Sequence, residues 1–235
     1  MSNEIEKRFN VLNPWFDEMD YDWTILKDLG QKNSFKKHEI VFRQNEDGND
    51  LYLVIKGRVR LFLISPNGEE KALAVIGTNG LIGECILNDD SRYSSSAITA
   101  SEVELIRISK DVFLEKISNE PRYTSQVLDL ITKKYRLLCM QTLQLSYTKS
   151  LPRMCATFVH LSIRYGETLA SQEIRLTINF THQEMANLLG ITRVTIAKNI
   201  KWLEENKYIR KDGRYYIINN LDNLANLANE ELMLD

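Results

Sequence analysis

The stretch that decides the fold runs from Thr181 to Asn206 and reads THQEMANLLGITRVTIAKNIKWLEEN. Thr181 and Glu184 form a capping box, in which each side chain satisfies a backbone N–H that the first helical turn leaves unpaired. Gly190 permits the sharp exit that other residues resist at the end of a helix. The sequence therefore predicts two short helices separated by a tight turn.

The second of these helices is predicted to begin at Thr192 and to have two unlike faces. Its apolar residues Ile196, Ile200 and Leu203 recur at helical spacing. The opposite face is polar and cationic, and consists of Arg193, Thr195, Lys198 and Asn199. Such a face suits the major groove of DNA. Paired helices with a glycine turn also occur in many helical proteins, so this pattern alone leaves DNA binding open.

A basic hairpin follows the two helices and favours DNA binding. Two short strands, Tyr208–Arg210 and Tyr215–Ile218, flank an Asp-Gly turn signal within Lys211–Arg214. Residues 180–220 contain seven basic residues (Arg193, Lys198, Lys201, Lys207, Arg210, Lys211, Arg214) and four acidic ones (Glu184, Glu204, Glu205, Asp212). The whole chain has a net charge of −2, so basic charge is concentrated here. A winged helix-turn-helix that contacts phosphates is predicted.

The composition is that of an ordinary globular protein with 235 residues, which is enough for two domains. The N-terminus lacks the apolar stretch of a secretory signal, and no apolar run approaches the ~20 residues of a membrane span. A cytoplasmic protein that does not enter a membrane is therefore expected. The cysteines Cys85, Cys139 and Cys155 are scattered, and the three histidines match no metal motif, so no metal site is expected.

The front half predicts an α+β protein whose N-terminal part is a small β-barrel or jelly roll. Leu51–Ile55 and Arg58–Ile64 are predicted to form a hairpin across Lys56–Gly57. Other expected strands are Glu39–Phe42, Lys71–Ile76, Leu81–Glu84, Ser96–Ala100 and Val103–Ile108. This segment has a single histidine, His38, which argues against a metal-dependent enzyme of the cupin type.

A long helix is predicted from Pro121 to about Tyr147. Two sets of residues seven apart form an a/d seam: Leu128, Ile131, Tyr135, Leu138, Thr142 and Leu145. This seam either packs on the chain's own β domain or joins two chains. Leu130, Leu137 and Leu143 lie beside it and are available for the first role, so a parallel dimer is favoured.

A break at Ser150–Pro152 is predicted to separate this helix from the next one, Arg153–Tyr165. The expected domains are therefore an effector-sensing domain (residues 1–120), a dimerisation helix with its hinge (121–149) and a DNA-binding domain (150–235).

This order of elements resembles the bacterial cyclic-AMP receptor and fumarate–nitrate regulator (CRP/FNR) family of transcription factors. The local matches are Glu39–Phe42, Leu51–Val54 with Lys56–Gly57, Ile82–Glu84, Phe180–Glu184 and Thr192–Ile196. The resemblance implies a homodimeric transcription factor in which a small effector in the β domain biases the dimer helix. It also implies double-stranded, palindromic DNA and RNA polymerase as partners, with half-sites about 34 Å apart.

The resemblance places an effector pocket at Gly83, Glu84, Cys85, Arg92, Ser95, Ser96, Tyr135 and Leu138. Relatives that bind cyclic AMP hold its phosphate with an arginine where this chain has Ser95, so the effector is expected to be a different, unknown small molecule. A buried phosphate without a cation is costly. For Glu84, a capped or salt-bridged loop carboxylate is favoured over contact with a ligand. The N-terminus lacks the cysteine cluster of iron–sulfur relatives, while a haem bound by His38 or Cys85 stays open.

The recognition helix departs from many relatives, which have a glutamate where this chain has Val194. Valine packs on a thymine methyl, so half-sites rich in A·T are expected. The predicted base contacts are Arg193, Val194, Ala197 and Lys198, and the predicted backbone contacts are Thr181, Gln183, Thr192, Thr195, Lys211 and Arg214. The competing hypothesis is a ligand-binding module whose winged helix contacts another protein. An enzyme is not expected, because the sequence contains no recognisable catalytic array.

Overall fold

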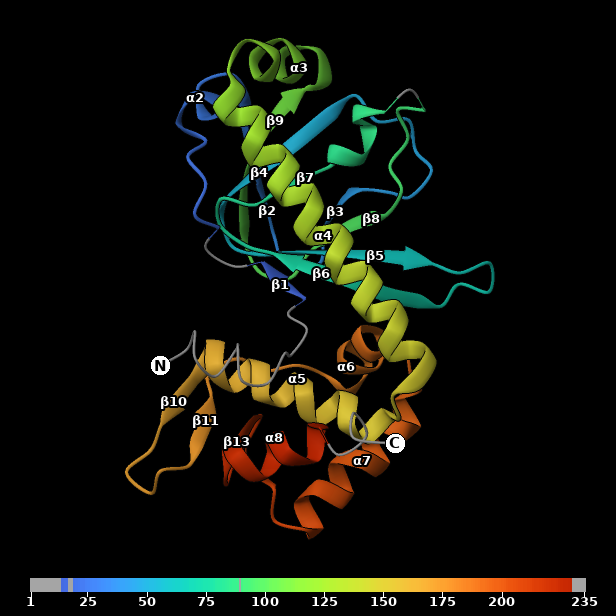
Figure 1. The fold of residues 1–235 in the computed structure, drawn as a ribbon, viewed down its shortest axis with the longest axis vertical. Coiled ribbons are helices and arrows are strands. Elements are labelled where there is room, and N and C mark those ends of the chain that lie inside the picture. Colours follow the sequence, from blue (N-terminus) through green and yellow to red (C-terminus); the bar gives the residue numbers. More distant parts are fainter. Residues whose placement is uncertain (1–13, 17–18, 89, 230–235) are drawn as a thin grey trace. The chain divides into compact units, whose positions relative to one another are not determined.

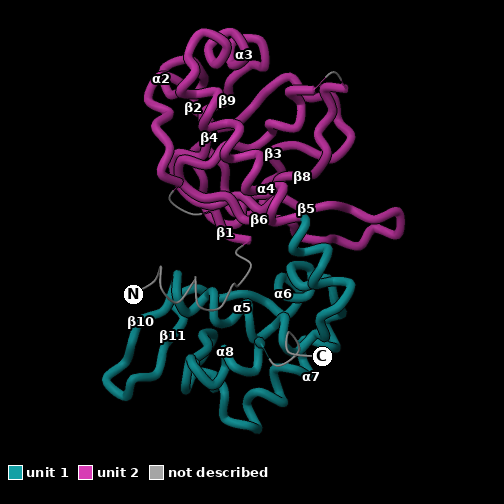
Figure 2. The backbone as a smooth tube through the Cα atoms, in the orientation of Figure 1, with its two compact units in different colours: residues 1–13, 139–235 teal, residues 14–138 magenta. Residues whose placement is uncertain are grey.

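The computed structural model describes residues 14–16, 19–88 and 90–229 (Figure 1). The chain divides into two compact units, one from Pro14 to Leu138 and the other from Cys139 onward (Figure 2). The long helix α4 contributes residues to both units. Each unit has its own buried core, so we describe the two units separately.

Two antiparallel-rich sheets make up most of the first unit. The first sheet has the strand order β1-β6-β5-β8-β3, with bounds Trp15–Phe16, Glu70–Ile76, Val59–Ile64, Ser96–Thr99 and Ile40–Phe42. The second has the order β2-β9-β4-β7, with bounds Gln31–Phe35, Val103–Ser109, Asp50–Lys56 and Leu81–Ile82. Phe42 and Tyr52 bring the two sheets together, with ring centroids 5.9 Å apart. The sheets form a jelly roll rather than a closed barrel.

The predicted hairpin across Lys56–Gly57 is wrong, although both strands exist. β4 pairs with β7 and β9, whereas β5 pairs with β6 and β8. The turn at Gly57 therefore carries the chain from one sheet to the other. Gly57 has a φ of +83°, and an added Cβ would lie 2.1 Å from the carbonyl oxygen of Glu102. Gly57 thus allows the chain to pass from the sheet of β4 to the sheet of β5. This connection requires the same left-handed backbone as a tight hairpin.

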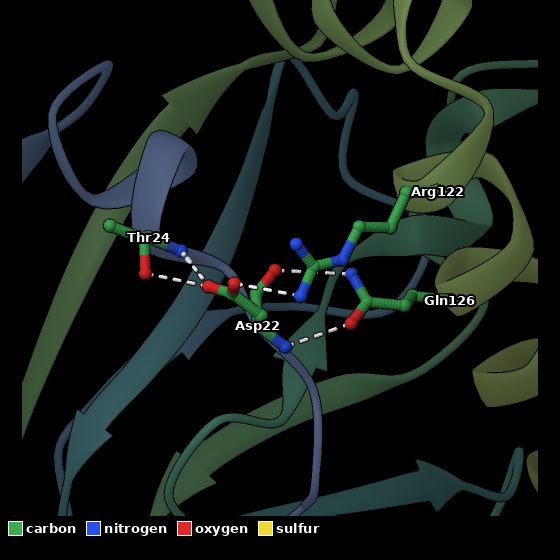
Figure 3. A network of polar contacts seen from close by, with 4 residues as sticks. All are labelled: Asp22, Thr24, Arg122 and Gln126. Atoms are coloured by element: carbon green, nitrogen blue, oxygen red, sulfur yellow. Dashed lines mark hydrogen bonds and ion pairs between the residues drawn. The ribbon is translucent and has the colours of Figure 1, made fainter.

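Short helices complete the first unit. α2 (Thr24–Lys27), the 3₁₀ helix η1 (Glu84–Leu87) and α3 (Lys110–Asn119) were not predicted, and η1 replaces the end of the expected strand Leu81–Glu84. The segment before α2 is fixed to α4 by a polar network (Figure 3). The amide of Asp22 donates to Gln126, the Asp22 carboxylate accepts from Arg122 at 2.8 Å, and Thr24 donates to that carboxylate.

The helix α4 (Pro121–Tyr147) has the predicted bounds. Its inner face is buried in the first unit at Tyr123, Val127, Leu130 and Leu137. The expected inward role of Leu130 and Leu137 is therefore confirmed. Leu143 differs, because its side chain is 48% exposed.

The break after α4 lies two residues earlier than predicted. α4 ends at Tyr147 and α5 (Ser150–Tyr165) begins at Ser150, so the break consists of Thr148 and Lys149. Pro152 lies in the first turn of α5, where a missing N–H removes no helical hydrogen bond.

The second unit is a winged helix-turn-helix with a four-stranded sheet. α6 (His182–Leu189) and α7 (Arg193–Glu205) are the paired helices. The sheet has the order β10-β11-β13-β12, with bounds Gly166–Thr168, Ile174–Leu176, Tyr215–Ile218 and Ile209–Asp212. β10, β11 and the final helix α8 (Leu221–Asn229), which packs on α5, were not predicted. An aromatic cluster of Phe158, Phe180 and Tyr216 joins α5, the segment before α6 and β13.

Candidate nucleic-acid interface

Three features fix the start of α6 and its exit toward α7. Thr181 Oγ1 accepts from the amide of Glu184 at 3.1 Å, and Glu184 accepts from the amide of Thr181 at 2.7 Å, which confirms the capping box. Gly190 has a left-handed backbone with a φ of 65°. The buried Arg153 of α5 donates to the carbonyl oxygen of Leu189 at 3.0 Å. The end of α6 is therefore satisfied from within the unit, and the entry angle of α7 is set.

The helix α7 has one buried face and one free face. Ile196, Ile200 and Leu203 are buried, as predicted. The predicted base contacts Arg193, Val194, Ala197 and Lys198 are all exposed, and Val194 is 66% exposed. Within the described chain, Arg193 and Lys198 make no ion pair. The free face of α7 therefore places one apolar side chain, Val194, between these two unpaired cations.

Asn199 does not belong to this free face. Its amide nitrogen donates to Ser150 Oγ at 3.2 Å, which ties α7 to the start of α5. Asn199 was predicted, from the sequence, to lie on the polar and cationic face. Its position nearer to the buried face gives it a structural partner instead.

The predicted backbone contacts near the helix starts already have local partners. Thr192 Oγ1 accepts from the amide of Thr195 and lies 2.9 Å from the hydroxyl of Thr195. Gln183 Nε2 donates to Asn187 at 2.6 Å. These side chains cap and brace α6 and α7. Their exposed atoms and the free N–H groups of two helix starts still offer donors to an anion.

The wing is the hairpin of β12 and β13, with a two-residue turn at Gly213 and Arg214. Gly213 has a φ of +61°, as the Asp-Gly signal requires. Lys211 Nζ lies 5.8 Å from the ring centroid of Tyr216, and the Arg214 guanidinium lies 5.3 Å from that of Tyr215. Both cations are exposed and make no ion pair within the described part of the chain.

Arg210 does not add a free charge to the wing. Its guanidinium donates to both carboxylate oxygens of Glu173, at 2.8 and 3.2 Å. Hydrogen bonds from Arg210 and then from Ser171 lower the pKa of Glu173 to about 2. Lys201 also pairs with Glu205, at 3.7 Å, so two of the seven basic residues counted in the sequence have acidic partners within the fold.

His182 reports on the charge where α6, α7 and the wing meet. Its Nε2 lies 3.4 Å from Tyr216 Oη. Burial lowers the pKa of His182, and the charges of Lys211 and Arg193 lower it further. Lys211 of the wing and Arg193 of α7 therefore act electrostatically on one point at the start of α6. Cations of two elements therefore lie near the start of α6, an arrangement that suits a polyanion.

The predicted effector residues fall into separate places. Gly83 has a φ of +88° and leads into η1, which holds Glu84 and Cys85. Glu84 Oε1 accepts from Lys134 Nζ at 2.6 Å, and Lys134 also donates to the carbonyl oxygen of Leu81. The side chains of Glu84 and Lys134 are only 15% and 13% exposed. Glu84 is therefore a salt-bridged carboxylate that links η1 to α4, and the sequence reasoning had missed Lys134.

The remaining predicted pocket residues differ in exposure. Ser95 and Ser96 are buried, and Ser96 Oγ accepts from the amide of Gln44. Cys85 Sγ accepts from the amide of Ser94 at 3.4 Å. Arg92 is 57% exposed and pairs with Asp47 and Asp90, so it is not brought to Glu84.

Tyr135 and Leu138 lie on the outer face of α4 together with the other seam residues. All six seam positions are exposed in a single chain: Leu128, Ile131, Tyr135, Leu138, Thr142 and Leu145. Tyr135 is 65% exposed and Leu128 is 59% exposed. The structure thus separates the buried inner face of α4 from an unburied apolar stripe, which we call the α4 stripe.

His160 gives the second unit a pH dependence. Burial, and then the charge of Arg164, lowers the pKa of His160 to about 4 from 6.5. Because the pKa of His160 is lower in the folded state than in the unfolded state, protonation of this histidine favours unfolding. The free energy of unfolding of the second unit is therefore unaffected above pH 6.5 and falls as the pH drops toward 4.

We expect the free energy of unfolding to be lower by about 1 kcal/mol at pH 5.5 than at pH 7.5. Thermal unfolding should show it, and His160→Gln should flatten it; an equal loss in that variant would refute this origin.

Comparisons with known proteins match this architecture. Residues 32–120 match the cyclic nucleotide-binding domain, and residues 152–227 match the Crp-like helix-turn-helix domain. The chain belongs to the CRP/FNR family. A CRP-like cAMP-activated global transcriptional regulator of Mycobacterium tuberculosis is 28% identical over 198 residues, covering 84% of this chain and 88% of the relative. The cyclic AMP receptor protein of Thermus thermophilus is 27% identical over 180 residues, covering 77% and 80%.

Solved CRP/FNR structures share the fold. A CooA mutant from Carboxydothermus hydrogenoformans superposes with a TM-score of 0.74 at 17% identity, covering 90% of this chain and 92% of CooA. OCPA-complexed CprK gives a TM-score of 0.68 at 16% identity, covering 90% and 97%. The chain is a CRP-like transcriptional regulator and not an enzyme, because its relatives are transcriptional regulators.

The described residues contain no group of three His, Cys, Asp or Glu side chains arranged to hold a metal ion. None of the helices in the described ranges combines the length and apolar character needed to cross a membrane.

Proposed function

We propose that this regulator acts as a homodimer that binds double-stranded DNA at palindromic sites, under the control of a small effector other than cyclic AMP. Two features carry the proposal: the exposed cationic face of the second unit, and the exposed apolar α4 stripe. Two chains joined along the stripe would present two copies of α7. Such a pair reads two half-sites one helical turn apart.

The chemistry of α7 supports base recognition. Arg193 is free to pair bidentately with a guanine, and Val194 is exposed and suited to a thymine methyl. Lys198 is free for a base edge or a phosphate. We therefore propose half-sites rich in A·T, with Lys211 and Arg214 on the backbone. RNA polymerase is the partner that a regulator bound near a promoter would meet.

The arrangement of the effector region argues against cyclic AMP. Ser95 occupies the position of the phosphate-binding arginine, and Arg92 is exposed and paired with acids. Lys134 neutralises the carboxylate of Glu84. A cyclic nucleotide would therefore leave its phosphate without a cation, which is costly in a buried site. A different small molecule in the first unit suits this region better.

Selection of bound fragments from a genomic library tests this function. We expect the purified chain to enrich palindromes with A·T-rich half-sites, with or without added candidate effectors. Binding should fall steeply as salt rises, because phosphate contacts release counterions. Failure to enrich a palindrome under any of these conditions would contradict the proposal and favour a winged helix that contacts another protein.

Two substitutions separate base contacts from backbone contacts. Arg193→Ala should reduce affinity for the selected site by about 1–3 kcal/mol and leave affinity for unrelated duplexes nearly unchanged. Lys211→Ala should weaken binding to all duplexes alike and reduce the salt slope by about one. Titrations of both variants against the selected site and a scrambled duplex measure this. Equal losses on both duplexes for both variants would rule out the assigned roles.

A further inference from the structure

The strand β11 and the residue before it balance the charges of the wing. The hairpin carries three cations, Arg210, Lys211 and Arg214, and one carboxylate, Asp212. Arg210 pairs with Glu173, and Asp212 Oδ2 lies 3.2 Å from Arg175 Nε. Of the three hairpin cations, Lys211 and Arg214 then remain without an ion pair to any described residue.

These ion pairs reach across a strand. β11 pairs with β13, and β13 pairs with β12, so β13 lies between the paired charges. Glu173 and Arg175 extend over β13 to reach Arg210 and Asp212. The pairs therefore link strands that are not neighbours and fix the hairpin to the rest of the sheet.

Tyr215 lies at the centre of this arrangement. The Arg175 guanidinium lies 4.9 Å from the ring centroid of Tyr215, and that of Arg214 lies 5.3 Å from the same centroid. Guanidinium groups are attracted to the face of an aromatic ring, which limits their freedom. Two cations share this ring, and one of them, Arg175, is paired with Asp212. Asp212 is also the cross-strand partner of Tyr215, so Asp212 and Tyr215 flank the turn that contains Arg214.

We infer that Arg175 is a positioning residue for the DNA-binding wing: it neutralises Asp212 and supports Tyr215, so that Arg214 is presented to a phosphate. This inference rests on the proposed DNA binding. Without Arg175, the carboxylate of Asp212 would be released next to the turn. It would then attract Arg214 or repel the phosphate, and either effect weakens binding without loss of a direct contact.

A double-mutant experiment separates this role from direct contact with DNA. We expect Arg175→Met to weaken binding of the full chain to every duplex about 3- to 10-fold and to reduce the salt slope by about one. Adding Asp212→Asn should restore affinity to within about 2-fold of the wild type and restore the slope. If the double variant stays as weak as Arg175→Met, or if Arg175→Met binds like the wild type, the inference is wrong.

Two further variants guard against loss of structure. Glu173→Gln breaks the other ion pair on the same sheet but releases a cation, so it should leave binding equal or tighter. Equal weakening by Glu173→Gln would mean that loosening of the sheet explains the effect, which contradicts the inference. Tyr215→Phe should bind like the wild type and Tyr215→Leu should not, because the ring supports Arg214 and its hydroxyl is dispensable; equal binding by both would also contradict it.

Binding of the wild-type chain to DNA shows which of the two proposals fails. A wild-type chain that ignores duplex DNA at low salt would overturn the proposed function itself. A wild type that binds DNA, with variants that depart from the expected pattern, would overturn only the role assigned to Arg175.

Discussion

Ile131→Asp should convert the chain into a monomer and reduce its affinity for a palindromic site by at least about 100-fold. Ile131 lies in the α4 stripe and is 39% exposed in a single chain, so its replacement removes little packing within the first unit. In a dimer the two aspartates would face each other in an apolar seam, where unpaired charges are costly. Sedimentation velocity gives the oligomeric state, and a titration with the selected duplex gives the affinity.

Leu143→Asp is the matched control for this substitution. Leu143 is on the same helix and is 48% exposed, but it lies outside the heptad positions of the α4 stripe. The control should therefore remain dimeric and bind DNA like the wild type. A dimeric Ile131→Asp protein, or equal dissociation by both variants, would show that the stripe is not the seam.

Lys134→Met should destabilise the first unit by about 3–5 kcal/mol, because it leaves a mostly buried carboxylate without its partner. Lys134 donates to Glu84 and to the carbonyl oxygen of Leu81, and both charged side chains are largely shielded from water. Denaturant unfolding followed by the fluorescence of Trp23, which is buried in this unit, measures the loss.

The double variant Lys134→Met with Glu84→Gln identifies the cause. Removing both charges should recover most of the lost stability, since a neutral pair has no large desolvation cost. If the double variant is as unstable as Lys134→Met, then the packing of the lysine stem or its bond to Leu81 matters, and the ion pair does not.

Local chemistry made the helix-turn-helix predictable. Thr181, Glu184 and Gly190 each specify a backbone conformation within a few residues, and the structure confirms all three. The Asp-Gly turn likewise specified the wing hairpin. The period of apolar residues separated the two faces of α4, because burial on a helix repeats with the turn of the helix.

Features that depend on contacts between distant segments were not predictable in this way. β10 is exposed along its whole length, so it has no alternating pattern to reveal a strand. The turn at Gly57 has the same local signature whether it joins paired strands or transfers the chain between sheets. α8 was missed for a different reason, because the helical spacing of Leu224, Ala225 and Ala228 was present in the sequence but was not used.

The candidate sites also differ according to whether a residue's role depends on local sequence or on distant contacts. The sequence identified the free cations Arg193, Lys198, Lys211 and Arg214, since exposure on an amphipathic helix or a hairpin tip follows from local pattern. It did not identify Lys134 or Arg175, whose partners are 50 and 37 residues away along the chain, respectively (Glu84 to Lys134 and Arg175 to Asp212). Ion pairs across such separations depend on the assembled fold.

The mass of the complex formed with a selected palindromic duplex tests the central claim most directly. The account predicts two chains per duplex, with half-site centres about one helical turn apart and binding that weakens steeply with salt. A chain that stays monomeric at all concentrations and does not bind duplex DNA at low ionic strength would contradict it.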